Sequence, residues 1–337
     1  MNALTNLRNS LYIALCIAAL YCTAGAQNSS PLNIMFYNVE NYFDTRDDSL
    51  TNDAEFLPSG PRRWTYGRFE KKRNDIAKVI LAACDDNAPA IVGLAEIENL
   101  FVLEELTLNS PLRPLNYKII HKESPDERGI DVALLYRPEL VTPLRYNFLS
   151  LKQKGYSGKT REILYARFRT VDGDTLHVYF NHWPSRYRGQ TQTDPLRKIA
   201  ANVLRNHVLQ MQNNFRNPKI VIMGDFNDEP QNHSIRDVLL QGSGLVNLSA
   251  NWAPAGTLKY RQRWQIFDQI IISQTLLDAD AALHTTPKQA SIVNKDFLLE
   301  ADPKYKGQRL YRTYIGYKYY GGISDHLPVR LELTNNR

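Results

Sequence analysis

The sequence contains little cysteine. Only 3 of its 337 residues are cysteines, and Cys16 and Cys22 lie within an expected leader. Cleavage of that leader leaves Cys84 as the one cysteine of the mature chain, so no intrachain disulfide is possible there even though export is expected. Cys84 falls in a helical pattern of apolar residues, and we expect it to be a small buried core residue.

Long apolar runs are also scarce, and the one that stands out covers residues 11–20. Arg8 precedes this run and the small residues Ala24–Ala26 follow it. A positive start, an apolar stretch and a small-residue cleavage site are typical of a secretory signal peptide, which we place over residues 1–26. The run is shorter than the ~20 residues that span a bilayer, which argues against a membrane anchor.

The type of leader determines whether the mature protein is expected to be released or anchored in a membrane. A lipoprotein anchor through Cys22 is disfavoured, because bulky Tyr21 stands where a small residue is needed. We therefore predict that residues 27–337 form a single domain with no transmembrane span. We also predict a monomer that is secreted or periplasmic after cleavage near Ala26.

Several common catalytic motifs are missing as well. The chain has no cysteine pair and no His-Glu-x-x-His segment, which excludes the usual zinc patterns. It has no Gly-x-Ser-x-Gly elbow, which excludes the common serine hydrolase arrangement. A glycine-rich phosphate loop is also absent, since Gly321-Gly322 is too short and is expected to shape the loop before Ser324.

Charge of either sign is present in ordinary amounts. Charged residues make up 23% of the chain and hydrophobic residues 43%, as in a typical globular protein. The formal net charge of +6 and a pI near 9.0 predict a mild attraction to polyanions. Many secreted proteins are equally basic without binding nucleic acid, so charge alone does not identify a partner.

The pattern of apolar residues predicts a mixed order of strands and helices. Helical spacing runs from Phe69 to Cys84, and Asp194 followed by Pro195 predicts the start of another helix. We expect four bases near the first helix to form its solvated face: Lys71, Lys72, Arg73 and Lys78. Strands are predicted over residues 32–37, 90–94, 131–136, 163–169, 175–180, 219–223, 266–273 and 327–333. Hairpins mixed with strand–helix units predict an α/β fold of two packed sheets with helices outside.

Short polar clusters lie at the ends of these predicted strands. They hold carboxylates, carboxamides and two histidines, and they cover residues 37–41, 95–99, 181–186, 224–228, 267–268 and 324–326. Phosphodiesters resist hydrolysis because the nucleophile must approach an anion, and a divalent cation offsets that charge. Hard cations such as Mg²⁺ prefer oxygen ligands. If the clusters meet on one rim, they can form a metal-dependent site for breaking phosphate esters.

Carboxylates in the clusters are candidate metal ligands. Glu96 is the best candidate because it ends a strand too apolar to face solvent, and Glu40 and Asp325 follow. The alternative for any one of them is a carboxylate that caps a helix or pairs with an arginine. Six clusters together make that alternative hard to sustain for all of them.

Histidines and neighbouring acids are candidates for proton transfer. His326, oriented by Asp268, could act as a general base, and His182 could donate to a phosphate oxygen or to the leaving group. Asp225 and Asn227 alternate along the chain, so both would face one side of an extended segment. They could then position the nucleophilic water and the phosphate together.

In combination, the motifs Gly224–Asn227 and Ser324–His326 resemble the endonuclease/exonuclease/phosphatase superfamily. Its members include pancreatic deoxyribonuclease, apurinic endonucleases, sphingomyelinases and inositol-polyphosphate 5-phosphatases. The resemblance covers about residues 32–334. It implies a four-layer α/β sandwich of two mixed β-sheets flanked by helices. It also implies cleavage of a phosphate ester with Mg²⁺, or with Mn²⁺ or Ca²⁺ in its place.

The resemblance also implies roles for single residues. It implies metal binding by Glu96, Glu40 and Asp325, and catalysis by His182, Asp225, Asn227, Asp268 and His326. Substrate binding is expected from Asn38, Asn181 and Arg186. The chain departs from the family at Ala95, where Gln is usual, and at Tyr37, where Trp is usual. Segments 181–186 and 312–322 resemble a bacterial secreted subgroup.

Three functions remain open at this point. The first is a secreted nuclease, supported by the net charge and by five bases among six tyrosines in residues 304–320. Ordinary loop packing would explain that stretch equally well. The second is a phosphatase or phospholipid phosphodiesterase, of inositol-phosphate or sphingomyelin type, on the same core. The third is a catalytically inactive binding domain, against which the intact polar positions of every motif argue.

Overall fold

The computed structural model describes residues 31–84, 87–153, 155–187, 189–252 and 255–336. The predicted signal peptide over residues 1–26, with Cys16 and Cys22, lies outside the described residues. Within the described ranges, no helix has the length and apolar character that crossing a membrane requires. Cys84 is buried, as the sequence predicted.

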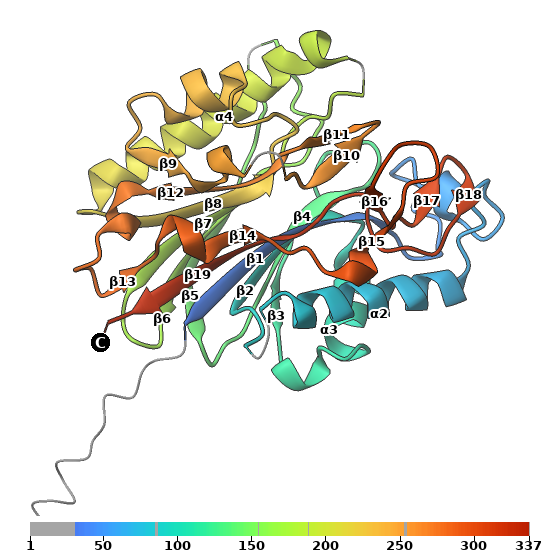
Figure 1. The fold of residues 1–337 in the computed structure, drawn as a ribbon, viewed down its shortest axis with the longest axis horizontal. Helices are drawn as coiled ribbons and strands as arrows, with labels where there is room; N and C mark the ends of the chain where they lie inside the picture. Colours follow the sequence, from blue (N-terminus) through green and yellow to red (C-terminus); the bar gives the residue numbers. More distant parts are fainter. Residues whose placement is uncertain (1–30, 85–86, 154, 188, 253–254, 337) are drawn as a thin grey trace, which may run out of the picture.

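The first sheet has seven strands and contains both termini of the folded part (Figure 1). Its central pair, β1 and β2, is parallel, and the other pairs are antiparallel. The order is β13 (Leu283–His284), β19 (Val329–Asn335), β1 (Leu32–Tyr42), β2 (Ile91–Ile97), β4 (Asp131–Tyr136) and β3 (Lys118–Ile120), with β14 (Ala290–Ile292) also on β19. The sheet is therefore mixed.

The second sheet has six strands and is also mixed. Its β7 and β8 run parallel, and its remaining pairs are antiparallel. The order is β5 (Val141–Leu149), β6 (Ile163–Thr170), β7 (Thr175–His182), β8 (Lys219–Asp225), β12 (Asp268–Ser273) and β9 (Leu245–Asn247). The predicted hairpin is formed by β6 and β7.

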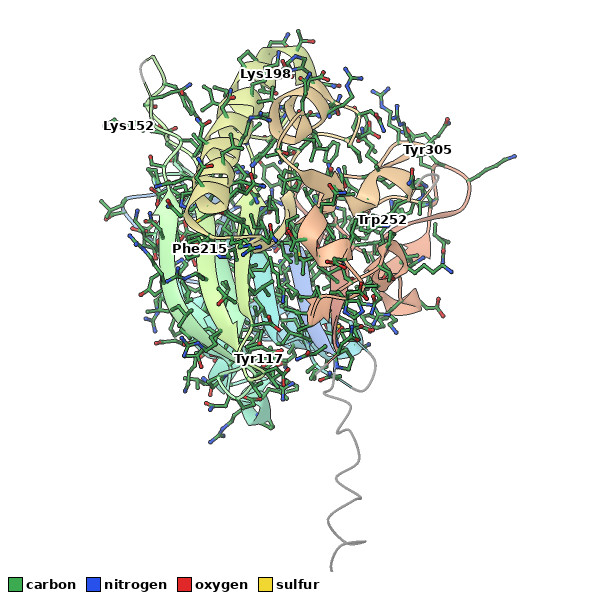
Figure 2. The ribbon with its side chains drawn as sticks, turned by 90° about the vertical axis from the view of Figure 1, so that its left-hand side faces the viewer. Tyr117, Lys152, Lys198, Phe215, Trp252 and Tyr305 are labelled. Carbon is green, nitrogen blue, oxygen red and sulfur yellow. The ribbon has the colours of Figure 1, made fainter. Side chains whose placement is uncertain are left out.

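Apolar side chains of the two sheets meet in a central core. Phe36 of β1 stacks on Phe180 of β7, with ring centroids 6.1 Å apart. Helices α2 (Tyr66–Ala82) and α3 (Leu100–Leu108) share a core with the other face of the first sheet. On the second sheet, α4 (Gln190–Asn214) and the π-helix η3 (Ser234–Leu240) do the same. Figure 2 shows α4 running across this sheet between Lys198 and Phe215. The predicted four-layer fold class is confirmed.

Short elements complete the chain. Three two-stranded ribbons gather at one end of the molecule, on the right in Figure 1: β10 (Leu258–Tyr260) with β11 (Arg263–Gln265), β15 (Leu299–Ala301) with β16 (Gln308–Leu310), and β17 (Tyr314–Ile315) with β18 (Lys318–Tyr319). The 3₁₀ turns are η1 (Ala54–Phe56), η2 (Arg113–Leu115), η4 (Leu248–Asn251), η5 (Gln274–Leu277), η6 (Pro287–Gln289) and η7 (Asp296–Leu298).

Helix α4 begins earlier than the sequence predicted. Asp194 and Pro195 were expected to start it, but the first helical residue is Gln190. The Thr193 hydroxyl donates to the carbonyl of Gly189 (2.8 Å), and an Arg197 guanidinium nitrogen donates to the carbonyl of Gln190 (3.0 Å). Pro195 lies inside the helix near its start, where its missing N–H removes one backbone hydrogen bond, and the N-cap position is Gly189, which makes no side-chain cap hydrogen bond.

A buried histidine of the second sheet makes stability sensitive to acid. His177 lies on β7 with Nδ1 2.9 Å from the Tyr165 hydroxyl, and its ring centroid is 5.0 Å from that of Phe215. Burial lowers the pKa of His177 from 6.5 to about 4, with Arg167 adding to the effect. Because the unfolded chain binds this proton more readily, stability is lost as pH falls below 6.5 toward 4.

We expect this histidine to reduce the free energy of unfolding by about 2 kcal/mol between pH 7 and pH 4. The variant His177→Gln removes the titrating group but keeps a polar partner for Tyr165. Urea unfolding of both proteins across this pH range measures the effect. If the two stability curves run parallel with pH, His177 does not carry the acid sensitivity.

Candidate active site

Strand register brings the predicted polar residues to the same rim of the two sheets. In the second sheet, His182 pairs with Asp225 across β7 and β8, and Asp225 pairs with Asp268 across β8 and β12. In the first sheet, Asn38 of β1 pairs with Ala95 of β2, immediately before Glu96. These side chains come from separate parts of the sequence and meet where the sheets end.

A pocket of about 460 Å³ opens at this rim. Its walls are Glu96, Arg128, His182, Ser185, Arg186, Tyr187, Asp225, Asn227, Leu258, Phe267, Asp325 and His326. Most of the predicted site residues therefore line one cavity. Asn38, Glu40, Asn181 and Asp268 are buried around it.

The backbone is strained at several of these positions. Glu40, Asn41, Glu96 and Asn227 all have positive φ, between 50° and 65°. At Glu96 the register between β2 and β4 shifts, as in a β-bulge. A bulge redirects a side chain that would otherwise follow the alternation of the strand. Non-glycine residues held in this region of φ are characteristic of functional sites.

His326 and Asp268 form a tight buried pair. His326 Nδ1 lies 2.6 Å from Asp268 Oδ2, and His326 Nε2 lies 3.8 Å from Asp225 Oδ2. Burial alone would lower the pKa of His326, but the two carboxylates outweigh it and raise that pKa well above 6.5. The surrounding carboxylates therefore favour the charged imidazole, and Asp268 fixes its orientation.

Asp225 lies at the centre of the site. Its Oδ2 accepts from Asn38 Nδ2 (3.2 Å) and its Oδ1 accepts from the Asn227 backbone N–H (2.9 Å). Burial raises the pKa of Asp225 to about 6, and Asp268 adds to this while His326 opposes it. Asp225 is therefore mostly ionised at neutral pH yet basic enough to accept a proton.

His182 faces the two central carboxylates without bonding to them. Its Nε2 lies 3.7 Å from Asp225 Oδ2 and 3.9 Å from Glu96 Oε1, too far for direct hydrogen bonds. Within the described part of the chain, its Nδ1 has no hydrogen-bond partner. Burial, followed by Arg161 and Arg128, lowers its pKa well below 6.5. His182 is therefore a neutral imidazole aimed at the pocket.

The donor atoms at this rim suit a hard cation. Asp225, Asp268 and His326 offer ligand atoms within 4.8 Å of one another, so this buried group could hold a metal ion. Glu96 adds a carboxylate whose Oε2 accepts from the Asn41 N–H (2.9 Å) and whose Oε1 has a long contact of 3.5 Å with Asn38. The set is rich in oxygen, as Mg²⁺ and Mn²⁺ require.

Arg312 occupies the space beside the other two predicted metal ligands. Its Nε and Nη2 donate to Glu40 Oε1 (3.0 and 2.9 Å), and Nη2 also donates to Asp325 Oδ2 (2.8 Å). The second Glu40 oxygen accepts from the Thr313 N–H (2.8 Å). All hydrogen bonds of the Glu40 carboxylate within the described residues are thus to residues 312 and 313.

Burial and Arg312 act in opposite directions on the pKa values of Glu40 and Asp325. Burial raises the pKa of Glu40 to about 7, with Asp325 adding and Arg312 opposing. Burial would also raise the pKa of Asp325, but Arg312, His326 and Lys72 together outweigh it and the pKa is lowered. Sequence reasoning assigned Arg312 only to a basic, tyrosine-rich stretch, and no local pattern pointed to its two partners.

The three residues predicted to bind substrate have different surroundings. Asn38 is buried against Asp225, and Asn181 bonds to the Met223 carbonyl (3.2 Å) and to Trp183 Nε1 (3.1 Å). Arg186 lines the pocket. Its Nε donates to the Asn227 carbonyl (2.7 Å) and its Nη2 to Asp228 (2.7 Å). Arg186 thus fixes the turn that carries Asn227.

Lys72 and Arg73 do not lie on a solvated face, so that prediction was wrong. Lys72 is buried, and its Nζ donates to the Glu40 carbonyl (3.0 Å), to Thr313 Oγ1 (2.6 Å) and to the Ile323 carbonyl. Burial lowers its pKa to about 8. Lys72 lies three residues after Phe69 and four before Ile76, so helical spacing already put it on the apolar stripe.

We expect Lys72→Met to reduce the free energy of unfolding by about 1–3 kcal/mol. The variant keeps the length of the side chain but leaves the Glu40 and Ile323 carbonyls without their buried donor. Urea denaturation measures the loss. The matched control is Lys78→Met on the exposed side of α2, which loses only a contact of Nζ with the Phe297 ring (4.1 Å) and for which a change below about 1 kcal/mol is expected. Equal losses in both variants would contradict the structural role.

Solved structures share this architecture at low sequence identity. A mannosyl-6-phosphatase of Bacteroides thetaiotaomicron, Bt3783, matches with a TM-score of 0.59 and 16% identity over 90% of this chain and 99% of that chain. The human Nocturnin catalytic domain with bound sulfate anion matches with 0.57 and 14% identity over 91% and 95%. D. rerio TDP2 complexed with single-strand DNA product matches with 0.54 and 14% identity over 91% and 100%. These likenesses show the fold.

Sequence comparison identifies the family. No curated protein matches the chain. The family model described as Endonuclease/Exonuclease/phosphatase family matches residues 33–335, almost all of the described chain, including both sheets and the pocket between their ends. The protein therefore belongs to the endonuclease/exonuclease/phosphatase family and is a phosphoesterase.

Proposed function

We propose that the protein is a secreted, Mg²⁺-dependent phosphodiesterase of the deoxyribonuclease-like type that hydrolyses nucleic acid. The observation that carries this proposal is the meeting of Asp225, Glu96 and the Asp268–His326 pair around one pocket. The formal net charge of +6, of which Arg8 of the leader carries one, is consistent with a mild attraction to an anionic polymer. The alternative substrates are small phosphate esters, including inositol phosphates and sphingomyelin.

We assign the metal ion to Glu96, with Asp325 as a second ligand and Glu40 behind it. Glu96 and Asp325 line the pocket, whereas the Glu40 carboxylate is engaged by Arg312 and by the Thr313 N–H. When bound, the cation offsets the negative charge of the phosphate and stabilises the leaving oxygen.

The protein's own groups then carry the proton transfers. Asp225 is ionised at neutral pH and lies beside the Asn227 turn, so it can accept a proton from the attacking water. His326 is charged and held by Asp268, so its Nε2 can donate to the phosphate. His182 presents a neutral Nε2 to the same space and can donate to an oxygen of the phosphate or of the leaving group. Sequence reasoning placed the base on His326, whereas these charge states favour Asp225.

Plasmid nicking tests the nuclease proposal. We expect protein from residue 27 onward to nick supercoiled plasmid in Mg²⁺, and EDTA to abolish the nicking. Nicking that persists in EDTA would overturn the metal assignment. If plasmid and RNA stay intact while an inositol phosphate or sphingomyelin is hydrolysed, the substrate belongs to the alternative class.

We also propose that the chain is one of a bacterial secreted subgroup and is exported after cleavage near Ala26. The supporting observation is the leader pattern, with Arg8 before the apolar run over residues 11–20. N-terminal sequencing of the protein recovered from periplasm or medium tests it. Recovery of the full-length chain from the cytoplasm alone would contradict export.

A further inference from the structure

A second, basic pocket adjoins the catalytic one. It has a volume of about 190 Å³ and is lined by Lys259, Arg261, Asp302, Lys304, Tyr305, Arg309, Leu310, Arg312, Ile315 and Asp325. Asp325 lines both pockets. On β10, Leu258 faces the catalytic pocket and its neighbour Lys259 faces the basic one, as alternation along a strand requires.

The basic pocket is built by the ribbons at the right-hand end of Figure 1. Strand β10 supplies one wall, and the chain from β15 to β17 supplies the other. Figure 2 places Tyr305 on the side of the molecule opposite Lys152. Because Asp325 lines both pockets, the basic pocket lies next to the catalytic one.

Most cations of this pocket are balanced by carboxylates. Lys259 Nζ lies 2.8 Å from Asp302, which also accepts from two backbone N–H groups, and Arg309 Nε lies 2.7 Å from Glu300. Arg312 is shared between Glu40 and Asp325. These carboxylates therefore neutralise most of the positive charge of Lys259, Arg309 and Arg312.

Two cations of the pocket are not balanced. Arg261 and Lys304 are exposed, and among the residues that the structure describes neither has a carboxylate within 4.0 Å. Their nearest described partners are aromatic: Arg261 lies over the Tyr260 ring (5.2 Å) and Lys304 over the Tyr305 ring (5.5 Å). A neutral ring attracts a cation without cancelling its charge, so both side chains remain available to an anion.

We propose that this basic pocket is a second anion subsite, which takes a phosphate group of the substrate other than the one being cleaved. The proposal rests on the proposed function, since the catalytic pocket must hold the scissile phosphate. A water molecule takes about 30 Å³ of the liquid, so the cavity has room for a group of five heavy atoms such as phosphate. Arginine and lysine side chains are the usual partners of phosphate oxygens.

The subsite defines a substrate class: phosphate esters that carry at least two phosphate groups on neighbouring units. A nucleic acid strand and a multiply phosphorylated small molecule share this chemistry. The scissile phosphate lies against Asp225 and Glu96, and the second phosphate lies beyond Asp325 against Arg261 and Lys304. The subsite does not contribute to the binding of a phosphodiester that has only one phosphate.

Kinetics on matched substrates test this assignment. The variant carries Arg261→Ala and Lys304→Ala, and its control carries Arg263→Ala and Lys306→Ala, which remove the same charge outside the pocket. We expect the variant to raise KM for a single-stranded oligonucleotide at least about tenfold with kcat unchanged. Hydrolysis of bis(p-nitrophenyl) phosphate, which has one phosphate, should stay unchanged, and the control should resemble wild type on both.

An inositol bisphosphate as a third substrate distinguishes the two sources of the second phosphate. A KM effect on the oligonucleotide alone assigns the subsite to a polymer, and an effect on the inositol bisphosphate alone assigns it to a small molecule. Equal losses on the one-phosphate and the multi-phosphate substrates, or an equally impaired control, would overturn the subsite.

A binding measurement separates failure of the subsite from failure of the proposed function. Calorimetric titration of inorganic pyrophosphate into metal-free mature protein should show binding that the double variant weakens at least about tenfold and the control preserves. If no substrate is hydrolysed but this pattern holds, the proposed function fails and the subsite stands. If wild type, variant and control bind pyrophosphate alike, the subsite is refuted whatever the enzyme hydrolyses.

Discussion

Asp225→Asn is expected to lower kcat by at least ~10²-fold, the usual contribution of a positioned general base. The change preserves shape, and the amide oxygen can still accept from Asn38 Nδ2 or from the Asn227 N–H. It removes the negative charge that faces His182 and His326, and with it the group that accepts the proton of the attacking water. Initial rates on plasmid or on a chromogenic phosphodiester, at saturating Mg²⁺, measure the loss.

Two controls test whether the loss of activity is specific to Asp225 and whether the variant is folded. Asp280→Asn makes the same chemical change at an exposed position and should leave kcat unaltered. Thermal unfolding should show that Asp225→Asn is folded at the assay temperature. Near-wild-type activity in a folded Asp225→Asn protein would contradict the assignment of the catalytic centre. Near-wild-type activity in His326→Ala would contradict it as well.

Local sequence patterns predicted the strands that carry the site, although the predicted ends at residues 37, 180 and 223 fall short of the observed ends at Tyr42, His182 and Asp225. His182 and Asp225 close apolar runs, and Asp268 lies in another, so their place at strand ends was predictable without a structure. The parallel register of β7 and β8 then sets His182 beside Asp225. Because a buried strand and its polar end are both local features, the sequence could reveal them.

Contacts between distant segments were not predictable in this way. Arg312 bonds to Glu40 across 272 residues of sequence, and no sequence pattern near either residue indicates the other as its partner. Lys72 bonds to residues 313 and 323, so its burial depends on how the C-terminal segment folds back over α2. The predicted helix start at Asp194 was wrong because the helix already begins at Gln190, after Gly189, which makes no side-chain cap hydrogen bond that a local pattern could reveal.

These long-range contacts decide how the predicted metal ligands can act. Glu40 and Asp325 share one guanidinium, whereas Glu96 keeps an oxygen with only a 3.5 Å contact to Asn38. We therefore expect a divalent cation to bind at Glu96, because among the described residues its carboxylate forms no salt bridge with a lysine or an arginine. Arg312 supplies a permanent positive charge on the neighbouring side of the pocket, close to where a phosphate must enter.

Glu96→Gln is therefore expected to weaken Mg²⁺ or Mn²⁺ binding by at least about tenfold, because it removes a negative charge from a small set of oxygen ligands. The amide oxygen can still accept from the Asn41 N–H, so the bulge at the end of β2 should survive. Calorimetric titration of the metal measures the affinity without reference to turnover. Glu139→Gln, an exposed change of the same kind, is the control and should bind metal as wild type does.

The same titration distinguishes the two places where the ion can bind. If Glu96 holds it, Glu96→Gln weakens binding and His326→Ala leaves most of it, since Asp225 and Asp268 remain beside an intact Glu96. If the buried Asp225, Asp268 and His326 group holds it, the pattern reverses, because His326→Ala removes one of three ligands. In that second outcome the Asp268–His326 pair cannot orient a free imidazolium toward the phosphate, and the roles proposed here for His326 and Glu96 would both be wrong.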